Sequence, residues 1–318
     1  MKNLAPISSL TIFLLSFFLV CDIQAQKPVP HIPVIDGQFW RIGEAPDLDS
    51  LNGSTLSKQH VVDHGFIKDK NGNWHLWACM RGTKVGRLLY GWEGKSLEGE
   101  IWQQKGIKAR ANPQWGEQHS PQEQIQAPYF MKIDDTYYCF YNSAGIRIMT
   151  SEDGANYQRP KFKDDNNVLY EKGGRDVMVM KEGDTFYAYS TISTVAKDGW
   201  LRGFVIVRTS KDLRRWSDYT IVSEGGRAGN GAVSAESPFV QKYKGYYYLF
   251  RSSSSTGSVF VYRSTDPYNF GVNNDDKLIG ELPVWAPELI FDNGQWYIRD
   301  IDDFQGVKLA KLKWKKDQ

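Results

Sequence analysis

Three acidic residues stand at the start of apolar, strand-like segments: Asp63 (DHGF), Asp176 (DVMV) and Glu236 (ESPF). Two further segments of the same kind begin with Gln126 (QAPY) and Trp285 (WAPE). Acidic residues often precede strands simply as turn formers. Carboxyl groups that crowd around one point, however, repel one another, and their pKa values move apart. Such crowding can produce one general acid and one general base.

The elements that must position these residues form an internal repeat. A glycine followed by an alternating apolar strand occurs at Gly86, Gly145, Gly203, Gly257 and Gly306, about 50 to 60 residues apart. Upstream of each glycine, an apolar strand and an aromatic strand flank a short polar turn such as Asn-Gly or Lys-Gly. These turns are typical of β-hairpins, because their residues tolerate positive φ.

The repeat predicts an all-β, five-bladed β-propeller with four-stranded antiparallel blades. The last unit ends at its third strand, so we expect residues 34–40 to supply the missing fourth strand and to close the ring. A solenoid is the structural rival, but its repeats are shorter and it requires caps. In a propeller the innermost strands line the central axis. The five strand-initial residues are therefore expected to face one another at equivalent positions.

The chain resembles the five-bladed propeller glycosidases of glycoside hydrolase family 43 and its relatives in families 32, 62, 68 and 117. The Gln-Ala-Pro and Trp-Ala-Pro segments are similar to the W-A-P element of family 43, and Ser210-KDLRRW matches its S-x-D-L-x-x-W connection. The resemblance implies that Asp63 is the general base, Asp176 the pKa modulator and Glu236 the general acid. Glycosidic cleavage needs one protonated and one ionised carboxyl.

Some residues depart from the family pattern. His64-Gly65 follows Asp63 where family 43 usually has proline, and Val177 replaces the proline of the family 32 R-D-P element. Around the acids we expect Gln126 and Trp285 to contact the sugar, although Trp285 could equally be core. Arg175 would bind substrate or pair with Asp176, and His64 would contact substrate or cap a strand.

The expected activity is release of a terminal sugar, as by an arabinofuranosidase, xylosidase or galactosidase, from a plant or algal polysaccharide or oligosaccharide, with inversion. Two alternatives stay open. One is a non-catalytic carbohydrate-binding propeller. The other is a retaining, family 32-like hydrolase with Asp63 as nucleophile, which the missing N-D-P-N-G motif disfavours.

The remaining expectations concern the leader, the partners and the cofactors. Residues 1–25 are typical of a secretory signal peptide, which leaves residues 26–318 as a single propeller domain that is secreted or periplasmic; lipidation at Cys21 is the alternative. With a net charge of +2 and no basic stripe, we expect no nucleic-acid partner. No membrane span and a monomer are expected. Cys79 and Cys139 are expected to be buried thiols. No metal-ligand spacing indicates a cofactor, although the resemblance allows a structural calcium ion.

Overall fold

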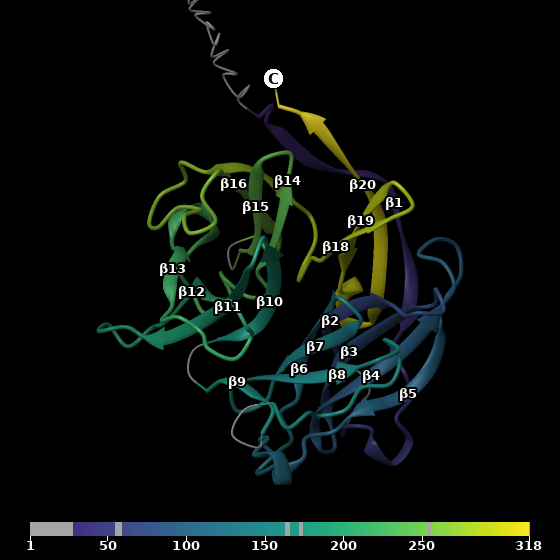
Figure 1. The fold of residues 1–318 in the computed structure, drawn as a ribbon. Helices are drawn as coiled ribbons and strands as arrows, with labels where there is room; N and C mark the ends of the chain where they lie inside the picture. Colours follow the sequence, from purple (N-terminus) through teal and green to yellow (C-terminus); the bar gives the residue numbers. More distant parts are fainter. Residues whose placement is uncertain (1–27, 55–58, 163–165, 172–173, 254–255, 318) are drawn as a thin grey trace, which may run out of the picture.

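The structure is a computed structural model that describes residues 28–54, 59–162, 166–171, 174–253 and 256–317. The predicted signal peptide and Cys21 lie outside these residues, so both stay predictions. The described chain forms five four-stranded antiparallel sheets arranged in a ring, which confirms the predicted five-bladed propeller (Figure 1). In this part of the chain, no helix is long and apolar enough to cross a membrane.

The first four blades follow the chain from the axis outward. Blade one contains β2 (His60–Lys68), β3 (Trp74–Thr83), β4 (Gly86–Gly94) and β5 (Gln103–Ala109). Blade two contains β6 (Gln126–Ile133), β7 (Thr136–Asn142), β8 (Ile146–Ser151) and β9 (Val168–Tyr170). Blade three contains β10 (Arg175–Glu182), β11 (Thr185–Val195), β12 (Leu201–Ser210) and β13 (Thr220–Ser223). Blade four contains β14 (Phe239–Tyr243), β15 (Tyr246–Ser252), β16 (Val259–Ser264) and β17 (Leu278–Leu282).

Blade five joins the two ends of the described chain. It contains β18 (Leu289–Asp292), β19 (Gln295–Asp300), β20 (Gly306–Lys316) and β1 (His31–Glu44). The β1 strand runs antiparallel to β20 and pairs Val34 with Lys313 and Trp40 with Leu309. Figure 1 shows purple β1 beside yellow β20. The predicted closure by residues 34–40 is thus confirmed.

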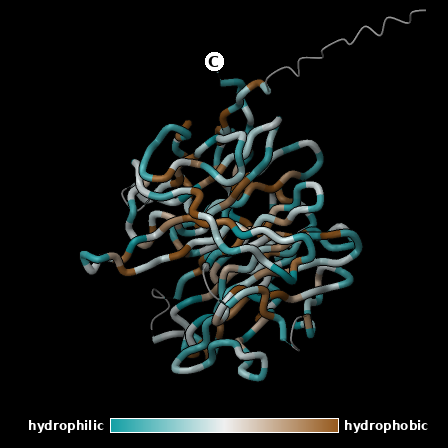
Figure 2. Tube along the Cα trace, turned by 60° about the vertical axis from the view of Figure 1, so that its left-hand side comes forward, coloured by the Kyte–Doolittle hydropathy of each residue, from teal (hydrophilic) through white to brown (hydrophobic). Residues whose placement is uncertain are grey.

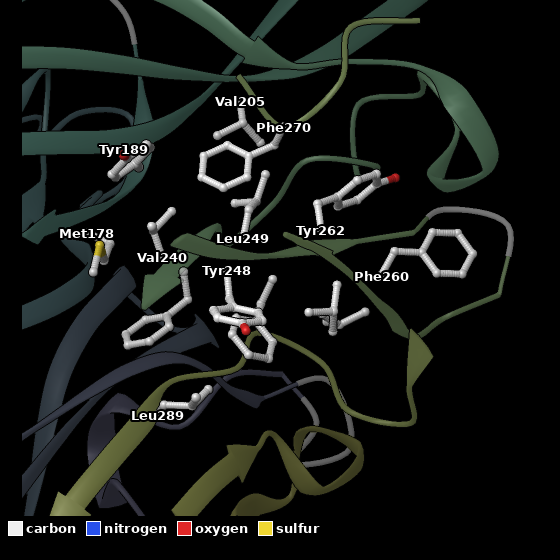
Figure 3. Packing of buried hydrophobic residues seen from close by; sticks show 14 of the residues in the cluster. Met178, Tyr189, Val205, Val240, Tyr248, Leu249, Phe260, Tyr262, Phe270 and Leu289 are labelled. Carbon is white, nitrogen blue, oxygen red and sulfur yellow. The ribbon is translucent and has the colours of Figure 1, made fainter. Parts of the chain in front are cut away.

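Short 3-10 turns occur in the connections, at η1 (Asp49–Leu51), η3 (Pro113–Trp115), η4 (Gly226–Ala228) and η5 (Asp302–Phe304). The hydrophobic core lies between the faces of neighbouring blades, because every second residue of a strand points to the same face. Figure 2 shows the hydrophobic segments running through the interior and polar segments in the peripheral loops. Figure 3 shows one such cluster, in which Tyr248, Leu249 and Phe270 are fully buried.

Two details of packing support the sequence interpretation. Cys79 and Cys139 are buried free thiols, as predicted. Near the axis the inner strands of blades one and two approach closely at Gly65, where an added Cβ atom would lie 2.5 Å from the carbonyl oxygen of Pro128. Only glycine avoids this contact with the neighbouring backbone, so Gly65 allows the two blades to meet.

Candidate active site

At or near the start of each inner strand one residue has positive φ, which we call the bulge position; in blades one, two and three it lies in a β-bulge, and it determines which side chain reaches the axis. In β10, for example, Arg175 pairs with Thr191 and Met178 pairs with Tyr189, so two residues of β10 oppose one of β11. One residue of every blade has positive φ at this point: Asp63 (30°), Ala127 (51°), Asp176 (56°), Ser237 (49°) and Ala286 (49°). A β-bulge re-aims a side chain and is common beside active sites.

The bulges correct the expected equivalence of the five strand-initial residues. Asp63 and Asp176 are the bulge residues of blades one and three, as their positive φ values show. Gln126, Glu236 and Trp285 each stand one position before the bulge residue of their own blade. The acids therefore come from two adjacent positions of the repeat. Glutamate, with one more methylene than aspartate, occupies the position before the bulge.

The three acids nevertheless lie in one pocket of about 430 Å³. Six of the predicted site residues line it: Asp63, Gln126, Arg175, Asp176, Glu236 and Trp285. Sequence reasoning missed the other polar and apolar lining residues: Arg81, Arg87, Gln124, Val233, Ile301 and Phe304, with Val62 and Ala286. A signal for the two arginines was available, because Arg81 lies near the end of β3 and Arg87 near the start of β4, on either side of the turn that joins these two largely apolar strands of blade one.

Ser237 connects the two aspartates. Its hydroxyl donates a hydrogen bond to Asp63 Oδ1 at 3.0 Å, and its backbone N–H donates to Asp176 Oδ2 at 3.2 Å. The backbone N–H of Asp176 donates to Asn142 Oδ1 at 2.8 Å, which ties the bulge of blade three to blade two. Residues from four blades thereby hold the two carboxyls in fixed positions.

Arg175 connects the other pair of acids. Its Nη2 lies 3.1 Å from Glu236 Oε1, and its Nε lies 3.5 Å from Asp176 Oδ2. The same guanidinium donates to Ser193 Oγ at 2.8 Å and to the carbonyl oxygen of Ala232 at 2.9 Å. A guanidinium between two carboxylates offsets their repulsion. Arg175 thus forms the expected pair with Asp176 and contacts Glu236 as well.

Burial and mutual repulsion perturb the acids. Burial, followed by the charge of Asp63, raises the pKa of Asp176 to about 8. Burial and Asp63 also raise the pKa of Glu236, while Arg175 opposes that rise. Groups this close titrate together rather than one by one. The cluster can therefore hold a proton near neutral pH and can supply both a proton donor and an acceptor.

His64 does not line this pocket. Its side chain is buried, only 1% exposed, and it lies on the other side of Asp63, where Arg299 Nη1 is 2.9 Å from its Nδ1. Burial and the charge of Arg299 hold the pKa of His64 well below its usual value, so the ring is neutral. The structure therefore places His64 behind Asp63 and outside the larger pocket.

The axial residues do not suit a calcium ion. Calcium prefers six to eight oxygen ligands, whereas the residues around the axis below Asp63 include the buried Arg299 guanidinium and the neutral His64 ring. A fixed positive charge at that point repels a second cation. Among the described residues, no group of three or more His, Cys, Asp or Glu side chains is arranged to hold a metal ion.

Fold and pocket together define a five-bladed propeller with an axial pocket of three carboxyl groups. The same fold occurs in a thermostable family 43 glycoside hydrolase (TM-score 0.59, 16% identity, covering 83% of this chain and 91% of the other). It occurs in a family 43 β-xylosidase/α-arabinofuranosidase from a compost microbial metagenome (0.53, 15%, 87% and 95%). It also occurs in a family 117 glycoside hydrolase from the marine bacterium Zobellia galactanivorans (0.56, 11%, 88% and 90%).

The likeness at this low identity is one of fold. No protein-family model matches the chain, and no curated protein matches its sequence. What the site does must therefore be argued from its own residues.

Proposed function

We propose that this protein is a glycoside hydrolase that releases a terminal sugar from a plant or algal polysaccharide or oligosaccharide, with inversion at the anomeric carbon. The observation that carries the proposal is the meeting of Asp63, Asp176 and Glu236 in one axial pocket. Structures that share this fold include enzymes named as a β-xylosidase/α-arabinofuranosidase and as an exo-1,5-α-L-arabinanase. Those names support a xylosidase- or arabinofuranosidase-like activity; a galactosidase-like activity is a further candidate.

The exposure of the carboxyls divides their roles. The side chain of Glu236 is 31% exposed, and that of Asp176 is 7% exposed. Glu236 can reach a leaving oxygen, and burial shifts its pKa upward, toward the protonated form, so we assign it as the general acid. Asp63 also lines the pocket and activates a water as the general base. Asp176 is too buried to reach a leaving group; it shares the Arg175 guanidinium with Glu236 and is therefore assigned as the modulator.

The pocket walls suit a sugar. Gln126 is the first residue of β6, and Trp285 precedes β18. Both line the pocket beside the acids. An indole presents an apolar face to the C–H groups of a sugar ring, and an amide can hydrogen-bond its hydroxyls. The Gln126 side-chain oxygen is buried and has no hydrogen-bond partner among the described residues. Both residues are therefore assigned to substrate binding.

A panel of aryl glycosides and oligosaccharides, with analysis of the released sugars, tests the activity. Glu236→Gln should lower kcat by roughly 10²- to 10⁴-fold on a glycoside with a poor leaving group, and much less with a good one. Glu152→Gln, an exposed change on the outer side of blade two, is the matched control. Full activity of Glu236→Gln on the poor leaving group would refute the acid assignment.

The anomeric form of the first product decides between the mechanisms. Inversion requires a water between the two carboxyls and gives a product of opposite anomeric configuration, which proton NMR detects. A product of unchanged configuration would instead support the retaining alternative with Asp63 as nucleophile. Measurable binding of oligosaccharides without cleavage of any glycoside would support the carbohydrate-binding propeller.

A further inference from the structure

A second, smaller cavity of about 30 Å³ lies on the axis, on the far side of the catalytic aspartates. Asp63 and Asp176 line both cavities. The other charged or titratable residues around the smaller one include His64, Glu288 and Arg299. The proposed reaction as described above uses none of these three side chains. They form a buried polar cluster directly behind the acids.

The repeat shows that the Glu288–Arg299 pair of this cluster occurs in blade five alone. Glu288 and Arg299 oppose each other across β18 and β19, and the backbone N–H of Arg299 donates to the carbonyl of Glu288. The other blades carry aromatic residues at the position of Arg299, namely Trp77, Phe140, Tyr189 and Phe250. They carry uncharged residues at the position of Glu288, namely Gly65, Tyr129, Met178 and Phe239.

A buried ion pair stabilises a fold no better than well-packed apolar residues of the same volume. Four blades fill this position with an aromatic ring, so the fold itself does not require a guanidinium there. Arg299 and Glu288 are only 6% exposed, and two of their polar atoms, Arg299 Nε and Glu288 Oε2, make no hydrogen bond in the described protein. A reason other than stability must account for the charge.

Arg299 is connected through His64 to Asp63, the proposed general base. Its Nη1 lies 2.9 Å from His64 Nδ1, and its Nε lies 3.4 Å from Glu288 Oε2. His64 is the residue after Asp63, whose φ of 30° is rare for any residue but glycine. Such backbone persists only where its surroundings hold it. The contact between Arg299 and His64 holds the bulge that directs the Asp63 side chain into the pocket.

The charges of the buried groups around Arg299 also connect it to Asp63. Burial raises the pKa of Glu288 to about 7, so its carboxyl cancels only part of the guanidinium charge. Burial lowers the pKa of Arg299, whereas the negative charges of Glu288 and then Asp63 favour its charged form. An arginine keeps its proton even when buried. The guanidinium therefore stays charged behind the carboxyls, and the carboxyl of Glu288 offsets more of that charge as pH rises through about 7.

We propose that Arg299 is a built-in axial cation, a positioning residue that holds Asp63 through His64 and offsets the crowded negative charge of the three acids. It stands where a divalent ion would otherwise have to act, so the site needs no calcium. The expected effect of Arg299 on the reaction rate rests on the proposed hydrolysis. Its effect on charge and stability can be tested without any substrate.

Several titratable or charged groups face Arg299 from the surrounding strands. They are Asp63 and His64 of β2, Tyr129 of β6, Asp176 of β10, Glu288 before β18 and Asp300 of β19. The charge of Arg299 lowers the pKa of Glu288, so without the guanidinium that carboxyl binds its proton more tightly in the folded protein. His64 would also accept a proton more readily. Compared with wild type, a variant without the guanidinium should therefore lose more unfolding free energy as pH rises from 5 to 8.

The first test is thermal unfolding of the full chain at pH 5 and pH 8, with EDTA or with added CaCl₂. Arg299→Met should lose more of its Tm between these pH values than wild type. Arg147→Met is the matched control, because Arg147 is also buried but lines neither cavity and binds the carbonyls of Trp115 and Gly116. Its Tm should be lower at both pH values by a similar amount. Neither EDTA nor CaCl₂ should move the Tm of wild type.

The second test is activity on whichever glycoside wild type cleaves. Arg299→Met should lose 10- to 100-fold in kcat/KM, the usual effect of removing a group that orients a reacting residue, and its pH profile should move. Arg299→Lys should keep the wild-type dependence of Tm on pH and recover part of the activity, and it carries the comparison if Arg299→Met does not fold.

Three results would overturn the proposal. They are parallel pH dependences of Tm in Arg299→Met and Arg147→Met, a Lys variant with a steeper dependence than wild type, and a wild-type protein that EDTA inactivates or destabilises and CaCl₂ restores. If wild type cleaves no glycoside, the hydrolase proposal fails, while the unfolding experiment still decides whether Arg299 acts as the axial cation.

Discussion

Replacing Asp176 by asparagine should make the protein more stable at pH 8 while it lowers the hydrolytic rate. Burial and the neighbouring Asp63 carboxylate raise the pKa of Asp176 from 3.8 to about 8. The folded protein therefore binds this proton more tightly than the unfolded chain does. Stability is lost as pH rises through the interval between the two pKa values. Asparagine has no proton to lose and escapes that penalty.

The size of the effect follows from the same shift. At about 1.4 kcal/mol per pH unit, ionisation of Asp176 removes roughly 4 kcal/mol of unfolding free energy between pH 5 and pH 8. Asparagine keeps an acceptor oxygen for the Ser237 N–H and loses only the 3.5 Å contact with Arg175 as an ion pair. At pH 5 the variant and wild type should then agree within about 1 kcal/mol.

Urea unfolding at pH 5 and pH 8 measures this difference. Asp135→Asn, in the exposed turn between β6 and β7, is the control and should follow wild type at both pH values. Parallel behaviour of Asp176→Asn and wild type would refute the reasoning, because it would mean that the folded protein does not hold the proton of Asp176. Burial and the charge of Asp63 would then not raise the pKa of Asp176 as the structure indicates.

Three further changes test other parts of the structure. Trp200 is 73% exposed in the hairpin turn between β11 and β12 and should contact a polymeric substrate. Trp200→Ala should raise KM for polysaccharide about 5-fold, because it removes about 1 kcal/mol of stacking. The KM for a small aryl glycoside should stay unchanged. Gly65→Ala should lower the unfolding free energy by about 1–3 kcal/mol, because its Cβ would meet Pro128, as urea unfolding would show. Glu117→Gln should cost about 3–5 kcal/mol in the same assay, because it leaves Arg159 without its buried partner.

The blade count and the closure of the ring were predictable from the sequence because both depend on short-range patterns. Each hairpin turn and each glycine before a third strand is visible in the sequence itself, as at Gly86 and Gly306. The missing fourth strand of the last unit then had to come from residues 34–40, upstream of the first unit. No knowledge of side-chain contacts was needed for these steps.

The register at the axis was not predictable in this way. Counting back from the aromatic strands assumes equal spacing in every blade, and a β-bulge is a backbone feature that leaves no fixed residue type. The pairing of Glu288 with Arg299 was equally hidden, because a charged residue within a strand is read as a surface residue. A signal existed in the repeat: aligned with the other blades, Arg299 stands where four aromatic residues stand.

Backbone strain and charge crowding meet at the same residues of this propeller. Positive φ at a non-glycine residue costs on the order of 1–3 kcal/mol, and the bulge repeats it in all five blades. Ala127, Ser237 and Ala286 fill three of these positions with small side chains, which keeps the axis open. The two aspartates at the remaining bulges and Glu236 one position earlier then converge on the space that is left. Packing offsets neither the backbone strain nor the repulsion of the carboxyls, so the arrangement is best explained by chemistry at the axis.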